Sequence, residues 1–235
     1  MTRAKPRRSV VVYTVVTGAY DRLRPARGVA TWLCFTDGSA SETVPWSLVR
    51  IPACESIDDR IRQARDIKLR PHIFLPPHRI SVWVDANLEL RVPPHKLAAF
   101  VDTEDMATFA YPPTFGPRDC AYQEAKACID RHKDSKALIT DQMARYRTAG
   151  FPEHAGLAET SIVVRRDTPS IRTFCEVWWD EVRRGSRRDQ LSFNFACWKT
   201  GSFYKTLPGS RVRNPFSLFR PHEQQIYGPP GRLHS

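Results

Sequence analysis

Short apolar runs rich in valine and isoleucine recur along the chain, and polar residues or glycines follow most of them. Runs of this length and composition are typical of strands buried on both faces of a sheet. The run that ends at Asp85 is the clearest, with Ile80, Val82 and Val84 alternating with Ser81 and Trp83. The segments predicted as strands are 9–16, 31–36, 47–51, 80–85, 107–111 and 160–164.

Helical periodicity separates these runs. Ile57, Ile61 and Ala64 recur at spacings of four and three, which predicts a helix over 58–70 that Pro71 ends. Because strands and helices alternate, the chain is predicted to be α/β, a single Rossmann-type domain with a mixed, mostly parallel sheet flanked by helices. Further helices are predicted at 93–100, 119–132, 134–148, 170–184 and 189–199.

The domain organisation follows from length and composition. A chain of 235 residues fits one large domain, which we place at 9–200. A basic tail precedes it at 1–8, and the segment 201–235, rich in Pro, Gly and Arg, is expected to wrap around the domain or form a partly disordered tail. No apolar stretch approaches the ~20 residues that span a bilayer. We read the first apolar run as a strand and not as a targeting segment.

Cysteine usage and charge narrow the function classes. The six cysteines form no Cys-x-x-Cys pair, which argues against a zinc site or a disulfide scaffold and favours a cytoplasmic protein. The net charge of +11 predicts polyanionic partners: nucleic acid, a membrane surface or phosphorylated small molecules. Basic residues concentrate only at 3–8 and 183–188, without a recognisable nucleic-acid motif, so an obligate nucleic-acid partner is not expected. Peripheral membrane contact through basic residues stays open.

Polar residues follow the first two predicted strands. Gly18 would let a backbone approach a ligand closely, and Tyr20 would stack on a base. Asp21 and Asp37 would hold the ribose or base, with Thr17 beside them. The alternative is that both segments are turns with a packed tyrosine.

A carboxylate and an amide follow the strand 80–85. Asp85 and Asn87 would supply oxygens to a divalent cation and a phosphate, unless they only form a turn. Arg65 and Lys68 lie three residues apart on the predicted helix, so they point the same way. They would grip a diphosphate near Asp85, or form an ordinary solvated face.

Three further polar residues precede or begin later elements. Glu159 would contact an acceptor hydroxyl or end a loop before a strand. Asp189 and Gln190 would orient a sugar and its nucleophile, or cap a helix. Gly-x-Gly-x-x-Gly and P-loop motifs are absent from the sequence, so classical dinucleotide and P-loop sites are unsupported.

The order of these segments resembles GT-A-type glycosyltransferases. It is most similar to a glycosyltransferase-like domain family, formerly a domain of unknown function, found in bacterial surface-polysaccharide contexts and plant Golgi proteins. The resemblance implies a nucleotide-sugar-dependent transferase with one Rossmann-like domain. The matching segments are 13–21, 32–37, 64–72, 81–87, 156–160, 178–179 and 188–192.

The resemblance also implies roles for the candidate residues. Asp85 and Asn87 fall where the fold family has its Asp-x-Asp metal motif, so Mn²⁺ or Mg²⁺ is the expected cofactor. Asn87 lacks the second charge, which lowers metal affinity and leaves metal-independent action open. The nearest C-terminal histidine that would serve as a metal ligand is His222, followed by His234.

The function we expect is transfer of a sugar from a nucleoside-diphosphate sugar, with UDP as the expected nucleoside diphosphate, to a hydroxyl acceptor. Asp189 is preferred over Glu159 as the base of an inverting reaction, and it would steady the sugar cation in a retaining one. Acceptor contacts are expected from 111–119 and the C-terminal segment. The alternatives are a non-catalytic nucleotide-sugar-binding module and a basic nucleic-acid-binding protein.

Overall fold

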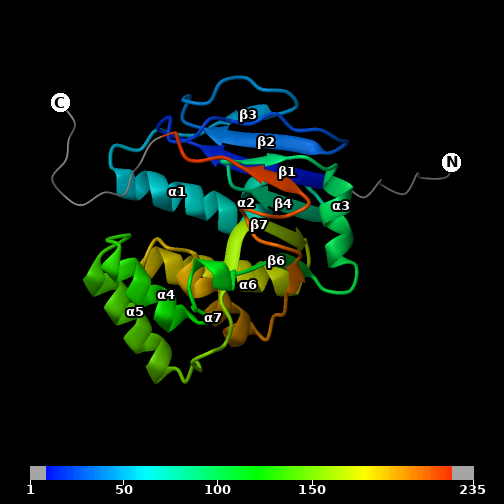
Figure 1. Ribbon diagram of the computed structural model, residues 1–235. Coiled ribbons are helices and arrows are strands. Elements are labelled where there is room, and N and C mark those ends of the chain that lie inside the picture. The colour runs from blue at the N-terminus through cyan, green and yellow to red at the C-terminus, as the bar shows by residue number, and fades with distance from the viewer. Residues whose placement is uncertain (1–8, 224–235) are drawn as a thin grey trace.

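A seven-stranded sheet forms the centre of the protein in the computed structural model, which describes residues 9–223 (Figure 1). Its strand order is β3-β2-β1-β4-β7-β6-β8. Within this sheet only β7 runs against the others, because it pairs antiparallel with β4 and β6. The predicted mixed, mostly parallel sheet is therefore confirmed. The strands are β1 (Val10–Val16), β2 (Thr31–Thr36), β3 (Ser47–Arg50), β4 (Ile80–Val84), β6 (Met106–Ala110), β7 (Ala158–Arg166) and β8 (Lys205–Leu207).

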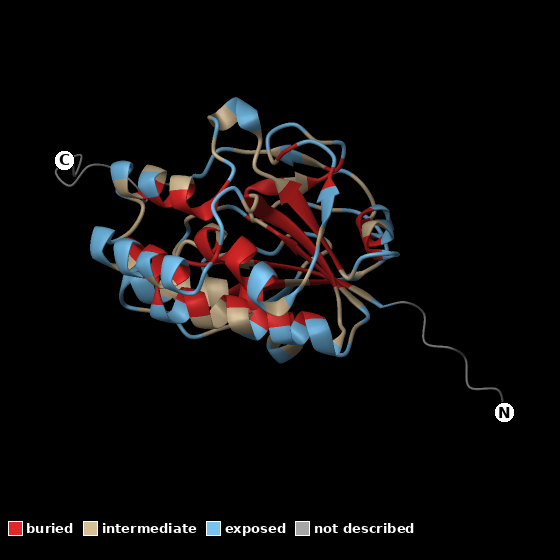
Figure 2. Cartoon of the chain, turned by 90° about the horizontal axis from the view of Figure 1, so that it is seen from below, coloured by how far each residue is buried: buried red, intermediate tan, exposed pale blue. Residues whose placement is uncertain are grey.

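Helices cover both faces of the sheet, as predicted for this fold class (Figures 1 and 2). Alternate side chains of β1 enter opposite cores, with Val11 and Tyr13 in one and Val12 in the other. The first core receives α1 (Ile57–Leu69), α6 (Pro169–Arg184) and α7 (Gln190–Thr200). The second receives α3 (Pro94–Ala98) and a 3₁₀ turn, η1 (Ala99–Val101). The central strands are consequently buried on both sides.

Two further helices, α4 (Ala121–Asp130) and α5 (Lys136–Thr148), pack against α7 at one side of the molecule (Figure 1). Their shared core is aromatic, and the rings of Tyr146 and Phe195 stack with centroids 3.8 Å apart. This helical layer lies beyond the loop that follows β6, which includes a 3₁₀ turn, η2 (Pro113–Phe115). The α4–α5 layer therefore lies next to the carboxyl ends of the parallel strands.

Several short elements were not predicted. Pro71 does end α1, but it also begins α2 (Pro71–Phe74), since proline is favoured in a first helical turn. Strands β5 (Leu88–Leu90) and β9 (Ser217–Phe219) form a separate antiparallel pair, and β8 extends the main sheet. Segments of three residues carry too little alternation to be recognised from sequence. Strand β7 is longer than the predicted 160–164 at both ends.

The segment after α7 therefore contributes strands to both sheets within residues 201–223. The predicted tail at 1–8, the remainder of the C-terminal segment and His234 lie outside the described residues. Across residues 9–223 we find no helix with the length and apolar character needed to cross a membrane.

Candidate functional site

A cavity of about 600 Å³ lies at the carboxyl ends of β1 and β4, between the sheet and the α4–α5 layer. This size is within the range of small-molecule sites, and its position is where open α/β sheets bind ligands. Most of the residues singled out in the sequence line it. They are Thr17, Tyr20, Asp21, Arg65, Lys68, Asp85, Asn87, Glu159, Asp189, Gln190 and His222.

Gly18 and Asp37 do not line the cavity and instead build the turn behind it. The Gly18 amide donates to Asp37 Oδ2 at 2.8 Å, and Gly18 has a positive φ of 60°. Burial raises the pKa of Asp37, but hydrogen bonds from Ser39 and Gly18 outweigh burial and hold the pKa below its usual range. The carboxylate thus ties the end of β1 to the end of β2. A direct ligand contact, as predicted for both residues, stays a prediction.

A buried ion-pair cluster occupies the floor of the cavity. Lys68 is 2% exposed, and its Nζ lies 2.7 Å from Asp189 Oδ2 and 3.7 Å from Asp85 Oδ1. Arg65 Nε lies 3.1 Å from the other oxygen of Asp189. Thr160 Oγ1 accepts from Lys68 at 3.2 Å and donates to Asp189 at 3.0 Å. Lys68 is therefore an anchored charge and not part of a solvated face.

Asp189 stays ionised in this cluster. Burial raises its pKa, but the adjacent Arg65 and Lys68 overcome that effect and hold the pKa well below its usual range. Asp189 occupies the N-cap position of α7, yet its side chain makes no capping hydrogen bond and pairs with α1 instead. A carboxylate held so acidic is a weak proton acceptor, which counts against the predicted role of Asp189 as the base.

The end of α1 is held in place by Arg165, which is completely buried on β7. Its guanidinium donates to the carbonyl oxygens of Lys68 at 2.7 Å and Leu69 at 3.2 Å, and to the Tyr13 hydroxyl. Tyr13 in turn donates to the Lys68 carbonyl at 2.7 Å. A cation at a helix C-terminus is favoured by the exposed carbonyls there. Hydrogen bonds from Arg165 and Tyr13 therefore fix the backbone of Lys68.

Asp85 and Asn87 follow β4 with different surroundings. Asp85, whose side chain is 34% exposed, accepts a hydrogen bond from the Trp83 indole at 2.7 Å through Oδ1. Its Oδ2 receives no hydrogen bond from residues 9–223, and the residue lines the cavity. Asn87 is buried, and its amide nitrogen lies 3.4 Å from His222 Nε2. One carboxylate oxygen and one amide oxygen therefore remain for a cation.

His222 reaches this site from the C-terminal segment. Pairing of β9 with β5 places it there, and the Arg220 amide donates to the Asn87 carbonyl at 2.8 Å. Its Nδ1 lies 3.0 Å from Asp21 Oδ1, and its ring stacks on Tyr20 with centroids 4.6 Å apart. An imidazole that donates from Nδ1 to Asp21 accepts at Nε2, which matches the Asn87 amide. Asn87 and His222, both predicted as metal ligands, thus contact each other, and a metal-binding role for them stays a prediction.

Glu159 has the properties expected of a proton acceptor. It is 8% exposed, and burial together with the Asp85 charge raises its pKa, although hydrogen bonds from Ser161 and Arg211 and the charge of Arg211 oppose that rise. A raised carboxyl pKa brings the group closer to the pH at which general bases work best. Gln190 Nε2, in the same cavity, is buried without a hydrogen-bond partner among the described residues. Both groups are placed to meet a ligand.

The wall opposite the ion-pair cluster was expected only as loop contacts from 111–119 and the C-terminal segment. The structure brings both segments into the cavity lining. Their individual residues carry no motif, and loop positions have no periodicity that would reveal which side chains point inward. The wall consists of Tyr111, Phe115, Arg118, Glu124, Ala127, Cys128, Arg131, Lys133, Arg211 and Phe219.

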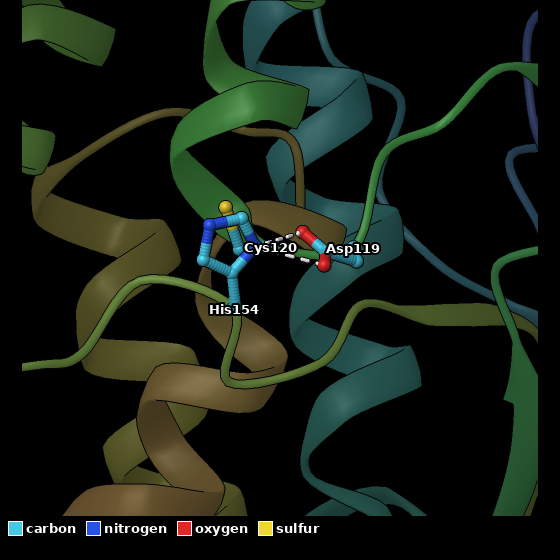
Figure 3. A group of neighbouring side chains, drawn as sticks. All are labelled: Asp119, Cys120 and His154. Atoms are coloured by element: carbon cyan, nitrogen blue, oxygen red, sulfur yellow. Dashed lines mark hydrogen bonds and ion pairs between the residues drawn. The ribbon is translucent and has the colours of Figure 1, made fainter.

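A separate group of metal-ligating side chains lies outside the cavity lining (Figure 3). Ligand atoms of Asp119, Cys120 and His154 lie within 4.8 Å of one another. The His154 imidazole points at the Asp119 carboxylate, and Nδ1 is 2.8 Å from both oxygens. The hydrogen bond with Asp119 raises the pKa of His154. An exposed ion pair beside a thiol that packs in the aromatic core of α4 and α7 accounts for this arrangement.

Comparison with known proteins places the chain among glycosyltransferase-like domains. The chain is 26% identical over 216 residues to a protein from Arabidopsis thaliana named "Probable hexosyltransferase MUCI70". That similarity covers 80% of this chain but only 37% of the plant protein, so the chain spans little more than a third of its relative. The profile of one family, described as TOD1/MUCI70, glycosyltransferase-like domain, matches residues 37–217. The match extends over well more than half of the chain, and the protein therefore belongs to this family of glycosyltransferase-like domains, which confirms the predicted resemblance.

Proposed function

We propose that this protein is a glycosyltransferase that moves a hexosyl unit from a nucleoside-diphosphate sugar, with UDP as the expected carrier, to a hydroxyl acceptor. The observation that carries the proposal is the buried Lys68–Asp189–Arg65 cluster at the strand ends, beside the half-exposed Asp85. Family membership and the hexosyltransferase name of the plant relative support the reaction class.

The nucleoside would lie against the end of β1. Tyr20 and His222 already form an aromatic stack there, and Asp21 and Thr17 supply polar groups to the same wall. The loop bearing Tyr20 is held to β2 through Gly18 and Asp37, so it is positioned before a ligand arrives. Pre-positioned groups lower the ordering cost of binding.

The leaving diphosphate would be stabilised by fixed cations. Lys68 is buried at the cavity floor, where charge interactions are stronger than in bulk water, and Arg65 lies beside it with its side chain 20% exposed. As the bond between the anomeric carbon and the phosphate oxygen breaks, negative charge grows on that oxygen, and both cations face it. Asp85 and Asn87 would hold a Mn²⁺ or Mg²⁺ ion together with the diphosphate. Such an ion would add Lewis-acid stabilisation of the same charge.

The acceptor proton would pass to Glu159. The acceptor hydroxyl oxygen attacks the anomeric carbon, its proton moves to a Glu159 oxygen, and the nucleoside diphosphate departs with the electron pair of the broken bond. Glu159 is buried with a raised pKa, whereas Asp189 is held ionised by two cations. We therefore assign the base role to Glu159. Asp189 is assigned to holding Lys68 and Arg65 and to steadying positive charge on the sugar.

Thermal unfolding with a panel of nucleoside diphosphates and nucleotide sugars tests the donor assignment. Each ligand is measured with Mn²⁺, with Mg²⁺ and with EDTA. A ligand at 100 times its Kd adds roughly 2.7 kcal/mol of stability, which is easily measured. We expect a UDP-selective shift that Asp85→Ala reduces. Equal shifts in EDTA would contradict a metal requirement but would support the donor pocket. The absence of a shift with any nucleotide would overturn the assignment of the donor site.

A second candidate is a nucleotide-sugar-binding module without turnover. The observation in its favour is Asn87, whose amide is turned toward His222 and which adds no negative charge beside Asp85. Transferase activity that appears only in Asn87→Asp would support the module. Turnover in the unaltered chain would exclude it.

A further inference from the structure

The cavity contains more positive charge than the proposed donor requires. Eight Lys and Arg side chains line it against five carboxylates. Lys68 and Arg65 are matched by Asp189 on the donor side. On the opposite wall stand three arginines, Arg118, Arg131 and Arg211, and the cavity-lining carboxylate that forms an ion pair with one of them is Glu124. The remaining cationic residues that line the cavity are Arg60, Lys133 and Arg188. Part of the excess positive charge therefore lies on the wall that we expect to contact the acceptor.

Arg211 is the most informative of the three. Its backbone amide donates to Glu159 Oε2 at 3.0 Å, so the residue adjoins the proposed base. Its guanidinium lies over two aromatic rings, 5.3 Å from the centre of Phe219 and 5.8 Å from that of Phe115. Its Nε is buried and has no hydrogen-bond partner, and its side chain makes no ion pair, within residues 9–223. A buried donor left unpaired costs free energy, which an anionic ligand would recover.

The other two arginines converge on the same place. Arg118 lies 4.7 Å from the centre of the Tyr111 ring and pairs with the buried Glu124 at 2.8 Å. Burial raises the pKa of Tyr111, and the charges of Arg118, Arg131 and Arg211 all oppose that rise. Three guanidinium groups therefore act electrostatically on one phenol, and Arg118 contacts its ring directly. Arg131 is exposed and forms no carboxylate ion pair in the described part of the chain.

Besides positive charge, this wall presents apolar aromatic rings. Tyr111 and Phe115 contact each other edge to face in the cavity lining, with centroids 6.2 Å apart. Apolar ring faces pack well against the C–H face of a sugar, whereas guanidinium groups pair with carboxylate or phosphate in a planar, bidentate manner. A surface that combines both features suits a sugar ring that bears an anionic group.

We propose that the acceptor is an anionic sugar, one that carries a carboxylate or a phosphate group. The anion pairs with the guanidinium of Arg211, the ring packs on Tyr111 and Phe115, and the reactive hydroxyl faces Glu159. Arg118 and Arg131 add to the positive field of this wall. The assignment of the sugar as acceptor rests on the proposed glycosyltransferase function, whereas the anion-binding surface rests on Arg211 and its neighbours alone.

Calorimetric titration of the full chain tests the proposal in two stages. The first stage titrates UDP, and the second titrates sugars into the UDP-saturated protein. The sugars are glucuronic acid, galacturonic acid and glucose 6-phosphate, each compared with its neutral parent, glucose or galactose. We expect the anionic sugars to bind at least about tenfold more tightly than the neutral ones, as a charge-assisted hydrogen bond predicts. The carboxylates and the phosphate separate the two sources of charge.

Arg211→Gln and Arg213→Gln form the matched pair of variants. Arg213 is exposed on the same loop and does not line the cavity. In Arg211→Gln we expect the preference for anionic sugars to fall to below about threefold, while UDP affinity and melting temperature stay unchanged. In Arg213→Gln we expect no change. Unaltered UDP affinity in both variants shows that the fold is intact.

Two results would overturn the anionic acceptor. One is equal affinity of the unaltered protein for charged and neutral sugars, and the other is full anion preference in Arg211→Gln. Loss of the donor function has a different signature: no UDP binding, with anionic sugars still preferred through Arg211. That outcome would remove the proposed transferase reaction but keep the anion-binding surface.

Discussion

The two walls of the cavity hold their positive charges in different ways. We call the side with Lys68, Arg65, Asp189 and Asp85 the donor wall, after its proposed role, and the side with Tyr111, Phe115 and Arg211 the opposite wall. On the donor side, Lys68 and Arg65 are fixed by a carboxylate, Asp189, which has its own hydrogen bond from Thr160. On the opposite side, Arg211 lies against the faces of Phe115 and Phe219. The first arrangement is neutralised and rigid, whereas the second keeps its charge available. The difference fits our proposals that the wall with Asp189 is preorganised for the donor and that the wall with Arg211 binds an anion.

The largest expected effect comes from removing the carboxylate of the donor wall. Asp189→Asn removes the carboxylate that pairs with Arg65 and with the buried Lys68, and it leaves Lys68 only the more distant Asp85. We expect the free energy of unfolding to fall by about 3 kcal/mol. Urea unfolding measures it. Asp180→Asn is the control, since Asp180 is half exposed and pairs with Arg183 and Arg184 on the surface. Its loss should stay below about 1 kcal/mol.

The contribution of Asp189 to the free energy of unfolding depends on pH, and the sign of that dependence is defined. The folded-state pKa of Asp189 is depressed, so its stabilising contribution is present above the pKa of the unfolded chain, about 4. The contribution is lost as pH falls through the folded-state value. The stability difference between the native chain and Asp189→Asn should therefore shrink in acid. A difference that grows below pH 4 would contradict the ion-pair assignment.

Glu159→Gln tests the group that lies between the two walls. We expect kcat to fall by about 10² or more, the usual contribution of a general base, with UDP affinity unchanged. In the native protein, kcat/KM should fall with decreasing pH through the raised pKa of Glu159, because the protonated acid accepts no proton. Glu153→Gln, on the preceding loop and exposed, is the control. Retained turnover in Glu159→Gln would return the base role to Asp189.

Asn87→Asp would sharpen the comparison by adding charge to the donor wall. A second carboxylate beside Asp85 should tighten Mn²⁺ binding in the presence of UDP by about tenfold, since ligand charge sets affinity for hard cations. Melting temperatures across a Mn²⁺ titration would show it. Asp85→Ala should abolish the gain. An unchanged Mn²⁺ response in Asn87→Asp would argue that this strand end holds no metal.

The smallest expected effect belongs to His222→Phe. Phenylalanine keeps the stack on Tyr20 but loses the hydrogen bonds to Asp21 and Asn87. We expect the free energy of unfolding to fall by about 1 kcal/mol, the typical net contribution of a hydrogen bond. Thermal unfolding without ligand measures it. A loss above about 3 kcal/mol would mean that His222 holds the C-terminal segment in place more firmly than these contacts indicate.

The donor wall was more predictable from sequence than its opposite. Short apolar runs define β1, β2 and β4 to within one or two residues, and the ends of β1 and β4 then point to Tyr20 and Asp85. The ion pairing of the α1 cations was harder to predict from the sequence. Lys68 sits at the end of a helix of ordinary amphipathic pattern, and its burial against Asp189 depends on tertiary contacts 121 positions away in the sequence.

Apart from the residues on α4, the opposite wall depends on loops and on short strands. Phe115 belongs to a 3₁₀ turn and Arg211 to the connection before β9, and neither segment has a repeating pattern that predicts which side faces inward. The role of Asp189 was also not predictable from local sequence. Its position favours a helix cap, yet two cations on α1 compete successfully for the carboxylate, because pairing buried charges outweighs one capping bond.

The pairing of β5 with β9 has a consequence for how the protein acquires its site. His222 contacts Asp21 across 201 positions of sequence, so this contact closes one of the longest loops in the described chain. Closing a loop costs conformational entropy before its contacts form, so we expect this contact to form after the more local ones. The sheet from β1 to β7 would be in place before the nucleoside wall is complete. A chain whose β9 has not yet docked would thus be compact but would lack His222 in the wall that we propose for the nucleoside, so folding of the sheet and completion of the site are separate steps.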